Sequence, residues 1–315
     1  MEDGAQSRFH QGVVTLRKRA QGGSQPANVA VSADEHARRL DEVFNHADDL
    51  AWQLTVYDAV HEGWRFANIG GRHALDTFGR RAALDSRSIA LELCCGMGDT
   101  CRYLAQRFGC RVSGIDVNQK EIAAARRSLS NHGGHVIAQV SFNRIDLRCW
   151  EPDCEYDLVY VIDSLMYLPN RSEIFEKARR SLVPGATLAI AELTAGRELD
   201  DDMRHFMWAS DGIVDVPALS TQLDMLRDGG FIAIEAEDMT ALAIETCEKI
   251  CAACVRHRGV LNATMSERRA SWEQENNRYW QAFRDGTLCY AFIFASVPLY
   301  EVHTRSTGDA APIVD

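Results

Sequence analysis

The chain has 315 residues, of which 46% are hydrophobic and 25% are charged, and its formal net charge at pH 7 is -11. This composition is typical of a packed globular protein and excludes a disordered or fibrous chain. The negative charge disfavours nucleic acid as a partner, no apolar run approaches the roughly 20 residues of a membrane span, and the N-terminus lacks a signal-peptide pattern. We therefore expect a cytoplasmic protein without membrane insertion, whose ten cysteines are reduced thiols.

The N-terminal part of the chain divides into a polar tail and a helical segment. Residues 1–33 are rich in Gly, Gln and Ser and show little periodic hydrophobicity, which predicts a flexible tail. From Asp34 to Leu54, apolar residues recur at steps of three and four, which predicts an amphipathic helix. We interpret residues 34–86 as a helical lid, and its mixture of glycines and aromatics predicts a pocket lining that includes Tyr57 and Trp64.

Short β-type runs alternate with helical runs through the rest of the chain. The predicted strands are 89–93, 111–115, 140–145, 157–162, 187–192, 231–236 and 289–296, and the clearest predicted helices are 100–108, 119–131, 172–182 and 217–227. Apolar strands separated by helices predict a mostly parallel sheet that is covered on both faces. The expected fold class is α/β, a Rossmann-like three-layer sandwich over residues 87–300. Helical cap insertions are expected at 193–216 and 237–286, and a C-terminal tail at 301–315.

The strongest functional signal is the segment IALELCCGMGDT at 89–100, in which a strand runs into glycines that open a helix. Such a turn brings backbone N–H groups and a helix N-terminus close to a polar ligand, and Gly96 and Gly98 permit its tight bend. A second predicted strand leads to Asp116, 24 residues after Glu92. A carboxylate there can accept hydrogen bonds from both hydroxyls of a ribose, so the pair predicts a nucleoside-binding site.

The same spacing fits a dinucleotide, so a nicotinamide-dependent oxidoreductase is one alternative and a non-catalytic nucleotide-binding module is another. Two residues disfavour NAD. Cys101 stands where the G-x-G-x-x-G pattern has its third glycine, and Glu92 would lie near the diphosphate and repel it. A cationic cofactor without phosphates fits an acidic first turn better.

Four motifs resemble, in order, those of class I S-adenosylmethionine-dependent methyltransferases: ELCCGMG at 92–98, GID at 114–116, NRIDL at 143–147 and YDLVYVID at 156–163. The resemblance covers about residues 88–192 and implies a seven-stranded sheet whose final strand is antiparallel. It also implies that S-adenosylmethionine is bound at its methionine end by Glu92 and Gly96, at its ribose by Asp116, and at its adenine by Val117, Asn118, Asp146 and Leu147, with Cys94, Gly98 and Ile162 completing the site. Cys94 departs from the family pattern, because the first glycine of the turn usually stands there.

The acceptor is expected beyond the fourth strand, at the carboxyl edge where such sheets bind ligands. Asp163 and Tyr167 are the candidate catalytic residues, which would orient the acceptor or take a proton from it. The alternative, weighted equally, makes Tyr167 a packing residue and Asp163 a cap. The expected pocket residues are Tyr57, Trp64, Met166 and Trp208. The segment lacks the Asn/Asp-Pro-Pro-Tyr/Phe motif of DNA amino-methyltransferases.

Outside these motifs the chain loosely resembles the branch that includes sarcosine/dimethylglycine, phosphoethanolamine, sterol, tocopherol and geranyl diphosphate methyltransferases. This resemblance implies methylation of a carbon, nitrogen or oxygen atom of a small-molecule acceptor, such as an amine, an isoprenoid or another natural-product precursor. Sterol and tocopherol members tend to have Glu and His where this chain has Asp163 and Tyr167. The sequence leaves the oligomeric state open, a homo-oligomer included.

A competing pattern is the C-x3-C-x2-C spacing at Cys247, Cys251 and Cys254, which radical S-adenosylmethionine iron–sulfur enzymes also have. In those enzymes the motif lies on a loop near the start of a β/α barrel, whereas residues 241–256 are predicted to form one helix with the thiols on one face. Three small apolar thiols on a buried helix face explain the pattern, so we expect no metal site.

Overall fold

The computed structural model of the chain describes residues 32–44, 68–129, 139–152, 154–264 and 268–299. The expected pocket residues Tyr57 and Trp64 lie outside these ranges, as do residues 1–31 and 301–315 of the predicted tails. The described elements, in chain order, are α1 (Ala33–Phe44), α3 (Gly71–Arg81), β1 (Ile89–Leu93), α4 (Asp99–Phe108), β2 (Arg111–Asp116), α5 (Gln119–Leu129), β3 (Val140–Arg144), β4 (Tyr156–Ile162), η1 (Leu165–Tyr167), α7 (Arg171–Arg180), β5 (Leu182–Ala195), α8 (Asp201–Asp211), α9 (Leu219–Asp228), β6 (Ile232–Asp238), α10 (Thr240–Arg256), α11 (Arg258–Thr264), α12 (Arg268–Arg284) and β7 (Leu288–Ser296).

In the described part of the chain, seven strands form one sheet in the order β3-β2-β1-β4-β5-β7-β6. The first five strands in this order pair in parallel, and β7 runs antiparallel to both β5 and β6. The central strands β1 and β4 are buried on both faces, which explains why their sequences are apolar runs rather than alternating patterns. The Rossmann-like α/β prediction, with its antiparallel final strand, is confirmed.

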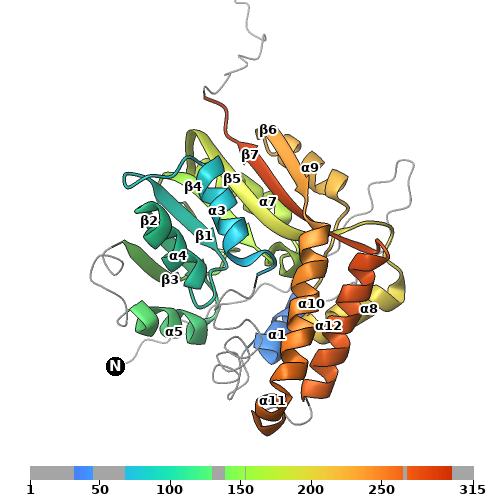
Figure 1. Cartoon of the computed structure of the whole chain (residues 1–315). Helices are drawn as coiled ribbons and strands as arrows, with labels where there is room; N and C mark the ends of the chain where they lie inside the picture. The colour runs from blue at the N-terminus through green and yellow to red at the C-terminus, as the bar shows by residue number, and fades with distance from the viewer. Residues whose placement is uncertain (1–31, 45–67, 130–138, 153, 265–267, 300–315) are drawn as a thin grey trace, which may run out of the picture.

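Helices cover both faces of the sheet, as Figure 1 shows. The buried residues Leu75, Phe78 and Leu104 of α3 and α4 belong to one hydrophobic cluster, which lies on one face. Phe175 of α7 and Leu226 of α9 belong to a second cluster on the other face. The sheet is therefore the middle layer of a three-layer sandwich.

Helix α5 lies beside β2 and β3, whereas α1, α8, α10, α11 and α12 gather together below the sheet in the view of Figure 1. Helices α10 and α12 pack against each other and against β7, and α1 contacts α8, which follows the carboxyl end of β5. This group of helices therefore lies beside the edge of the sheet at which the parallel strands end. None of the helices in the described ranges combines the length and apolar character that a membrane span needs.

The predicted boundaries of α7 and β5 are wrong. Helix α7 ends at Arg180, and β5 begins at Leu182 and continues through Pro184 and Gly185, although the sequence predicted a helix to Leu182 and a strand only from Thr187. The first part of β5 pairs with Tyr156 across a register shift, and Gly185 has a φ of 83°. This irregularity lets the strand include a proline and a glycine that usually end one.

Candidate functional site

The turn between β1 and α4 (residues 94–98, below called the β1–α4 turn) has a backbone that glycine favours at two positions. Gly96 and Gly98 have φ angles of 51° and 70°, in the left-handed region. A Cβ atom at Gly98 would lie 2.1 Å from the ring of Phe142, so a larger residue is also excluded by contact. The turn is therefore tight and close to β3, as the glycine pattern predicted.

Cys94 occupies the third left-handed position of this turn, with a φ of 59°. This conformation explains why the family usually has glycine there, because a residue with a Cβ atom pays about 1–2 kcal/mol for it. The turn keeps its shape with cysteine, and the departure from the family motif changes the side chain rather than the backbone.

Asp116, at the end of β2, is tied to the β1–α4 turn. Its Oδ2 accepts a hydrogen bond from the Gly96 amide at 2.9 Å, and its Oδ1 accepts one from the Asn118 amide at 2.8 Å. Burial raises the pKa of Asp116. The next side chain, Val117, is 53% exposed, whereas Asn118 is buried and its Oδ1 accepts a hydrogen bond from Lys120 N at the start of α5. These residues lie side by side at the carboxyl edge, as predicted.

Glu92, near the end of β1, is 3% exposed and lies among hydrogen-bond donors. Its carboxylate accepts hydrogen bonds from Thr100 Oγ1 at 2.6 Å, Cys101 Sγ at 2.8 Å and Tyr160 OH at 2.9 Å. Burial raises its pKa to about 7, and these donors oppose the shift. Among the described residues, neither Glu92 nor Asp116 forms an ion pair, so the negative charge of this region is not neutralised by the protein.

The residues predicted to contact adenine differ in their surroundings. Leu147 and Ile162 are 5% and 8% exposed and belong to the hydrophobic core beside the site. Asp146 is paired with Arg148, whose guanidinium contacts both carboxylate oxygens, the shortest at 2.5 Å. Partial burial favours a higher pKa for Asp146, but the hydrogen bonds from Arg148 outweigh it and lower the pKa. An adenine that binds Asp146 must therefore compete with Arg148.

Asp163, directly after β4, connects three parts of the fold. Its Oδ1 accepts a hydrogen bond from Tyr290 OH of β7 at 2.7 Å, and its Oδ2 accepts one from Ile69 N, ahead of α3, at 3.1 Å. Its φ of 48° is left-handed, a conformation that Asp tolerates better than most residues. Burial raises its pKa to about 6, and both donors oppose the shift. Asp163 is thus mostly ionised at neutral pH but close to its titration point.

Two residues near Asp163 were missed by the sequence analysis. Tyr290 is fully buried, and no motif distinguishes it from an ordinary aromatic residue of a strand. Glu192 of β5 is also fully buried; its carboxylate accepts hydrogen bonds from Leu165 N and Leu193 N, and burial raises its pKa to about 7. A glutamate inside the apolar run LAIAEL was the available signal for Glu192.

The other acceptor-side residues do not form one group. Met166 in η1 is 8% exposed, and Tyr167 is half-buried against the first hydrophobic cluster. Trp208 on α8 lies beside α1, with its ring 5.9 Å from the ring of His36 and its carbonyl accepting a hydrogen bond from Arg39. The described contacts therefore connect Trp208 with α1 rather than with Asp163.

The cysteine pattern of the competing hypothesis lies within α10. Cys247 and Cys254 are buried, Cys251 is partly buried, and all three are free thiols. No group of three potential metal ligands occurs among the described residues. The helical interpretation of this segment agrees with the structure.

The carboxylates at the β1–α4 turn, those of Glu92 and Asp116, fit S-adenosylmethionine better than a dinucleotide. Two carboxylates without cationic partners favour an ammonium and a pair of ribose hydroxyls, and they oppose a diphosphate. The exposed Val117 side chain beside Asp116 is in the position of an apolar contact for a nucleobase.

Comparisons with known proteins agree with this geometry. Residues 90–185 match the family model described as a methyltransferase domain. Methyltransferase GfsG of Streptomyces halstedii is 26% identical over 177 residues, which are 53% of this chain and 62% of that protein. Among solved structures, phosphoethanolamine N-methyltransferase 2 of Haemonchus contortus, in complex with phosphomonomethylethanolamine and S-adenosylhomocysteine, has a TM-score of 0.73 at 19% identity, covering 84% of this chain and 60% of that one. The [4+2]-cyclase SpnF has a TM-score of 0.65 at 20% identity, covering 80% of this chain and 96% of that one. This chain therefore spans about three fifths of the first two proteins.

Proposed function

We propose that this chain, whose residues 90–185 match a methyltransferase domain, is a class I methyltransferase that transfers a methyl group from S-adenosylmethionine to a small-molecule acceptor. The observation that carries the proposal is the β1–α4 turn, in which the Gly96 amide binds Asp116 and the unpaired carboxylate of Glu92 lies behind the same turn. This arrangement would join a site for a cation to a site for a ribose.

The residues of the turn would hold the cofactor at its two ends. Glu92 would attract the methionine ammonium, Asp116 would accept the ribose hydroxyls, and Val117 would contact the adenine. When bound, the cofactor supplies a methyl group on a sulfonium, so the protein has to place a nucleophile in line with it and exclude water. Asp146 would bind the adenine only when Arg148 moves away from its carboxylate.

The acceptor would lie between η1, α8 and α12, on the Asp163 side of the cofactor. Four half-buried aromatic side chains pack against the first hydrophobic cluster in this region: Tyr167, Phe206, Tyr279 and Trp280. Aromatic walls of this kind would favour an apolar or aromatic acceptor. Asp163, with a pKa of about 6, would take a proton if the acceptor atom must lose one. An amine or a natural-product precursor fits this description, and the names of the relatives support such a molecule.

We also propose the organisation and location that the sequence predicts. Residues 34–86 would act as a lid, and the segments 193–216 and 237–286 would form the cap around the acceptor. The negative net charge and the ten cysteines support a cytoplasmic protein that does not bind nucleic acid.

Incubation of the protein with isotopically labelled S-adenosylmethionine and a metabolite extract of its source organism tests the proposal. The expected result is a labelled product in the mass spectrum that is weakened by Asp163→Asn and retained in Asp224→Asn, a matched change at an exposed aspartate of α9 that lies outside the proposed cap. Binding of NAD without binding of S-adenosylmethionine would contradict the proposal. The likeness to a [4+2]-cyclase favours a second candidate, a cofactor-binding protein without methyl transfer, which predicts binding but no labelled product with any extract.

A further inference from the structure

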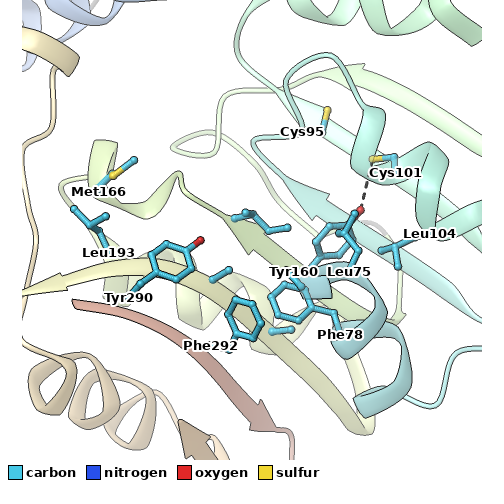
Figure 2. Packing of buried hydrophobic residues seen from close by; sticks show 14 of the residues in the cluster. Leu75, Phe78, Cys95, Cys101, Leu104, Tyr160, Met166, Leu193, Tyr290 and Phe292 are labelled. Atoms are coloured by element: carbon cyan, nitrogen blue, oxygen red, sulfur yellow. Dashed lines mark hydrogen bonds between the residues drawn. The ribbon is translucent and has the colours of Figure 1, made fainter. Parts of the chain in front are cut away.

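Two thiols lie next to each other at the base of the β1–α4 turn. Cys95 belongs to the turn and is 6% exposed, and Cys101 lies in the first two turns of α4 and is fully buried. A Cβ atom placed on Gly114 of β2 would be 2.7 Å from Cys95 Sγ and 2.9 Å from Cys101 Sγ, so both sulfurs lie over the same glycine. Figure 2 shows both at the start of α4.

A carboxylate accompanies the pair. Cys101 Sγ donates a hydrogen bond to Glu92 Oε2 at 2.8 Å, and Tyr160 OH lies 3.8 Å from the same sulfur and 2.9 Å from the same carboxylate oxygen. Glu92 is therefore in position to accept the thiol proton of Cys101. This use of Glu92 differs from its proposed role toward the cofactor.

We propose that Cys95 and Cys101 are a modification site, which hydrogen peroxide oxidises to a reversible disulfide. In the first step the sulfur of Cys95, the more exposed of the two, attacks the peroxide; the O–O bond breaks, a sulfenic acid forms on Cys95, and the displaced hydroxide takes the thiol proton of Cys95 and leaves as water. In the second step Cys101 gives its proton to Glu92 and its sulfur attacks the sulfur of Cys95; the S–S bond forms, the S–O bond breaks, and the leaving hydroxide takes the proton from Glu92 and departs as the second water. The two thiols lose two electrons and two protons, and the peroxide is reduced to two water molecules.

The disulfide would change the turn that is proposed to hold the cofactor. A sulfur–sulfur bond of about 2.05 Å would draw Cys95 toward α4 and remove the Cys101 hydrogen bond to Glu92. Gly96 directly follows Cys95, and its amide holds Asp116, so this contact would be disturbed as well. The effect on the cofactor rests on the proposed function, whereas the disulfide itself does not.

Peptide mapping of the full chain tests the modification. Residues 88–102 lie between Arg87 and Arg102 and form one tryptic peptide that contains Cys94, Cys95 and Cys101. After treatment of the reduced protein with hydrogen peroxide, followed by alkylation and digestion, we expect this peptide with a single alkylated cysteine and an internal disulfide that dithiothreitol opens. Alkylation of all three cysteines after oxidation would overturn the proposal.

Single variants identify the pair. Cys94→Ala should keep the disulfide, and so should Cys110→Ala, a matched change at a buried cysteine after the other end of α4. Cys95→Ala and Cys101→Ala should each abolish it. Loss of the disulfide in Cys94→Ala, or its retention in Cys95→Ala, would assign the bond to another pair and overturn the proposal.

Calorimetry with S-adenosylmethionine separates this proposal from the proposed function. We expect the oxidised protein to bind the cofactor about tenfold or more weakly than the reduced protein, and dithiothreitol to restore the affinity. Equal affinity of the two forms would overturn the predicted effect on the turn. Failure of the reduced protein to bind the cofactor would instead contradict the proposed function, and the peptide map would still decide the disulfide.

Discussion

Replacing Glu92 with Gln tests the predicted role of the acidic first turn. The amide has nearly the shape of the carboxylate and keeps one oxygen that can accept hydrogen bonds from Thr100, Cys101 or Tyr160, but it carries no charge. A hydrogen bond to a charged group contributes about 1.5–3 kcal/mol, so we expect the affinity for S-adenosylmethionine to fall by about 10- to 150-fold.

The pH dependence gives this prediction a second measurement. Because burial raises the pKa of Glu92 to about 7, about one carboxyl group in ten is ionised at pH 6 and about nine in ten at pH 8. Only the ionised form attracts the ammonium of the cofactor. The affinity of the unmodified protein should therefore rise between pH 6 and about pH 7.5, whereas that of Glu92→Gln should stay flat over this range.

Isothermal titration calorimetry measures both effects without knowledge of the acceptor. The control ligand is 5′-methylthioadenosine, which lacks the amino-acid end and should bind both proteins equally. The control variant is Thr100→Val, which removes a hydrogen-bond donor to Glu92 but keeps its carboxyl group; because this donor lowers the pKa of Glu92, the affinity of the variant should still rise with pH, over a higher pH range. An equal loss of affinity for 5′-methylthioadenosine, or an unchanged affinity of Glu92→Gln for S-adenosylmethionine, would refute the reasoning.

Two predictions concern stability. Gly98→Ala should lower the free energy of unfolding, measured by urea denaturation, by about 3 kcal/mol, because the new methyl group would meet the Phe142 ring and the φ of 70° is left-handed. The control is Gly259→Ala, in a helix where a Cβ atom meets nothing within 4 Å, and it should be neutral or stabilising. The pKa values of Glu92 and Glu192 are raised to about 7, above their values of about 4.3 in an unfolded chain, so the folded state binds more protons between these values. The free energy of unfolding should therefore fall as the pH rises from about 5 to 7, and Glu192→Gln should reduce this slope; a rise over the same range would contradict the assignment.

The part of the fold that could be predicted from the sequence is the part that local patterns determine. Strands β1 and β4 are apolar because both of their faces are buried, and they were located to within one residue. The β1–α4 turn was also predictable, since the left-handed angles of Gly96 and Gly98 depend on residues adjacent in sequence. The early start of β5 was not, because Pro184 and Gly185 usually end a strand and only the irregular pairing with β4 includes them.

The contacts of the candidate site depend on segments far apart in sequence. Tyr290 lies 127 positions after Asp163, and the two meet only because β7 enters the sheet antiparallel beside β5. No motif marks this hydrogen bond. Trp208 was grouped with the pocket for its aromatic character, and the docking of α1 on α8 decides its contacts instead.

The hydrogen bond from Ile69 N to Asp163 makes the approach of an acceptor a competition. A molecule that hydrogen-bonds to the Oδ2 atom of Asp163 in place of the Ile69 amide displaces this amide, and it thereby releases the chain where it enters α3. By thermodynamic reciprocity, a change that loosens this entry makes the carboxylate more available, and a change that tightens it weakens the acceptor. Substitutions near residue 69 should thus alter acceptor affinity without contacting the acceptor.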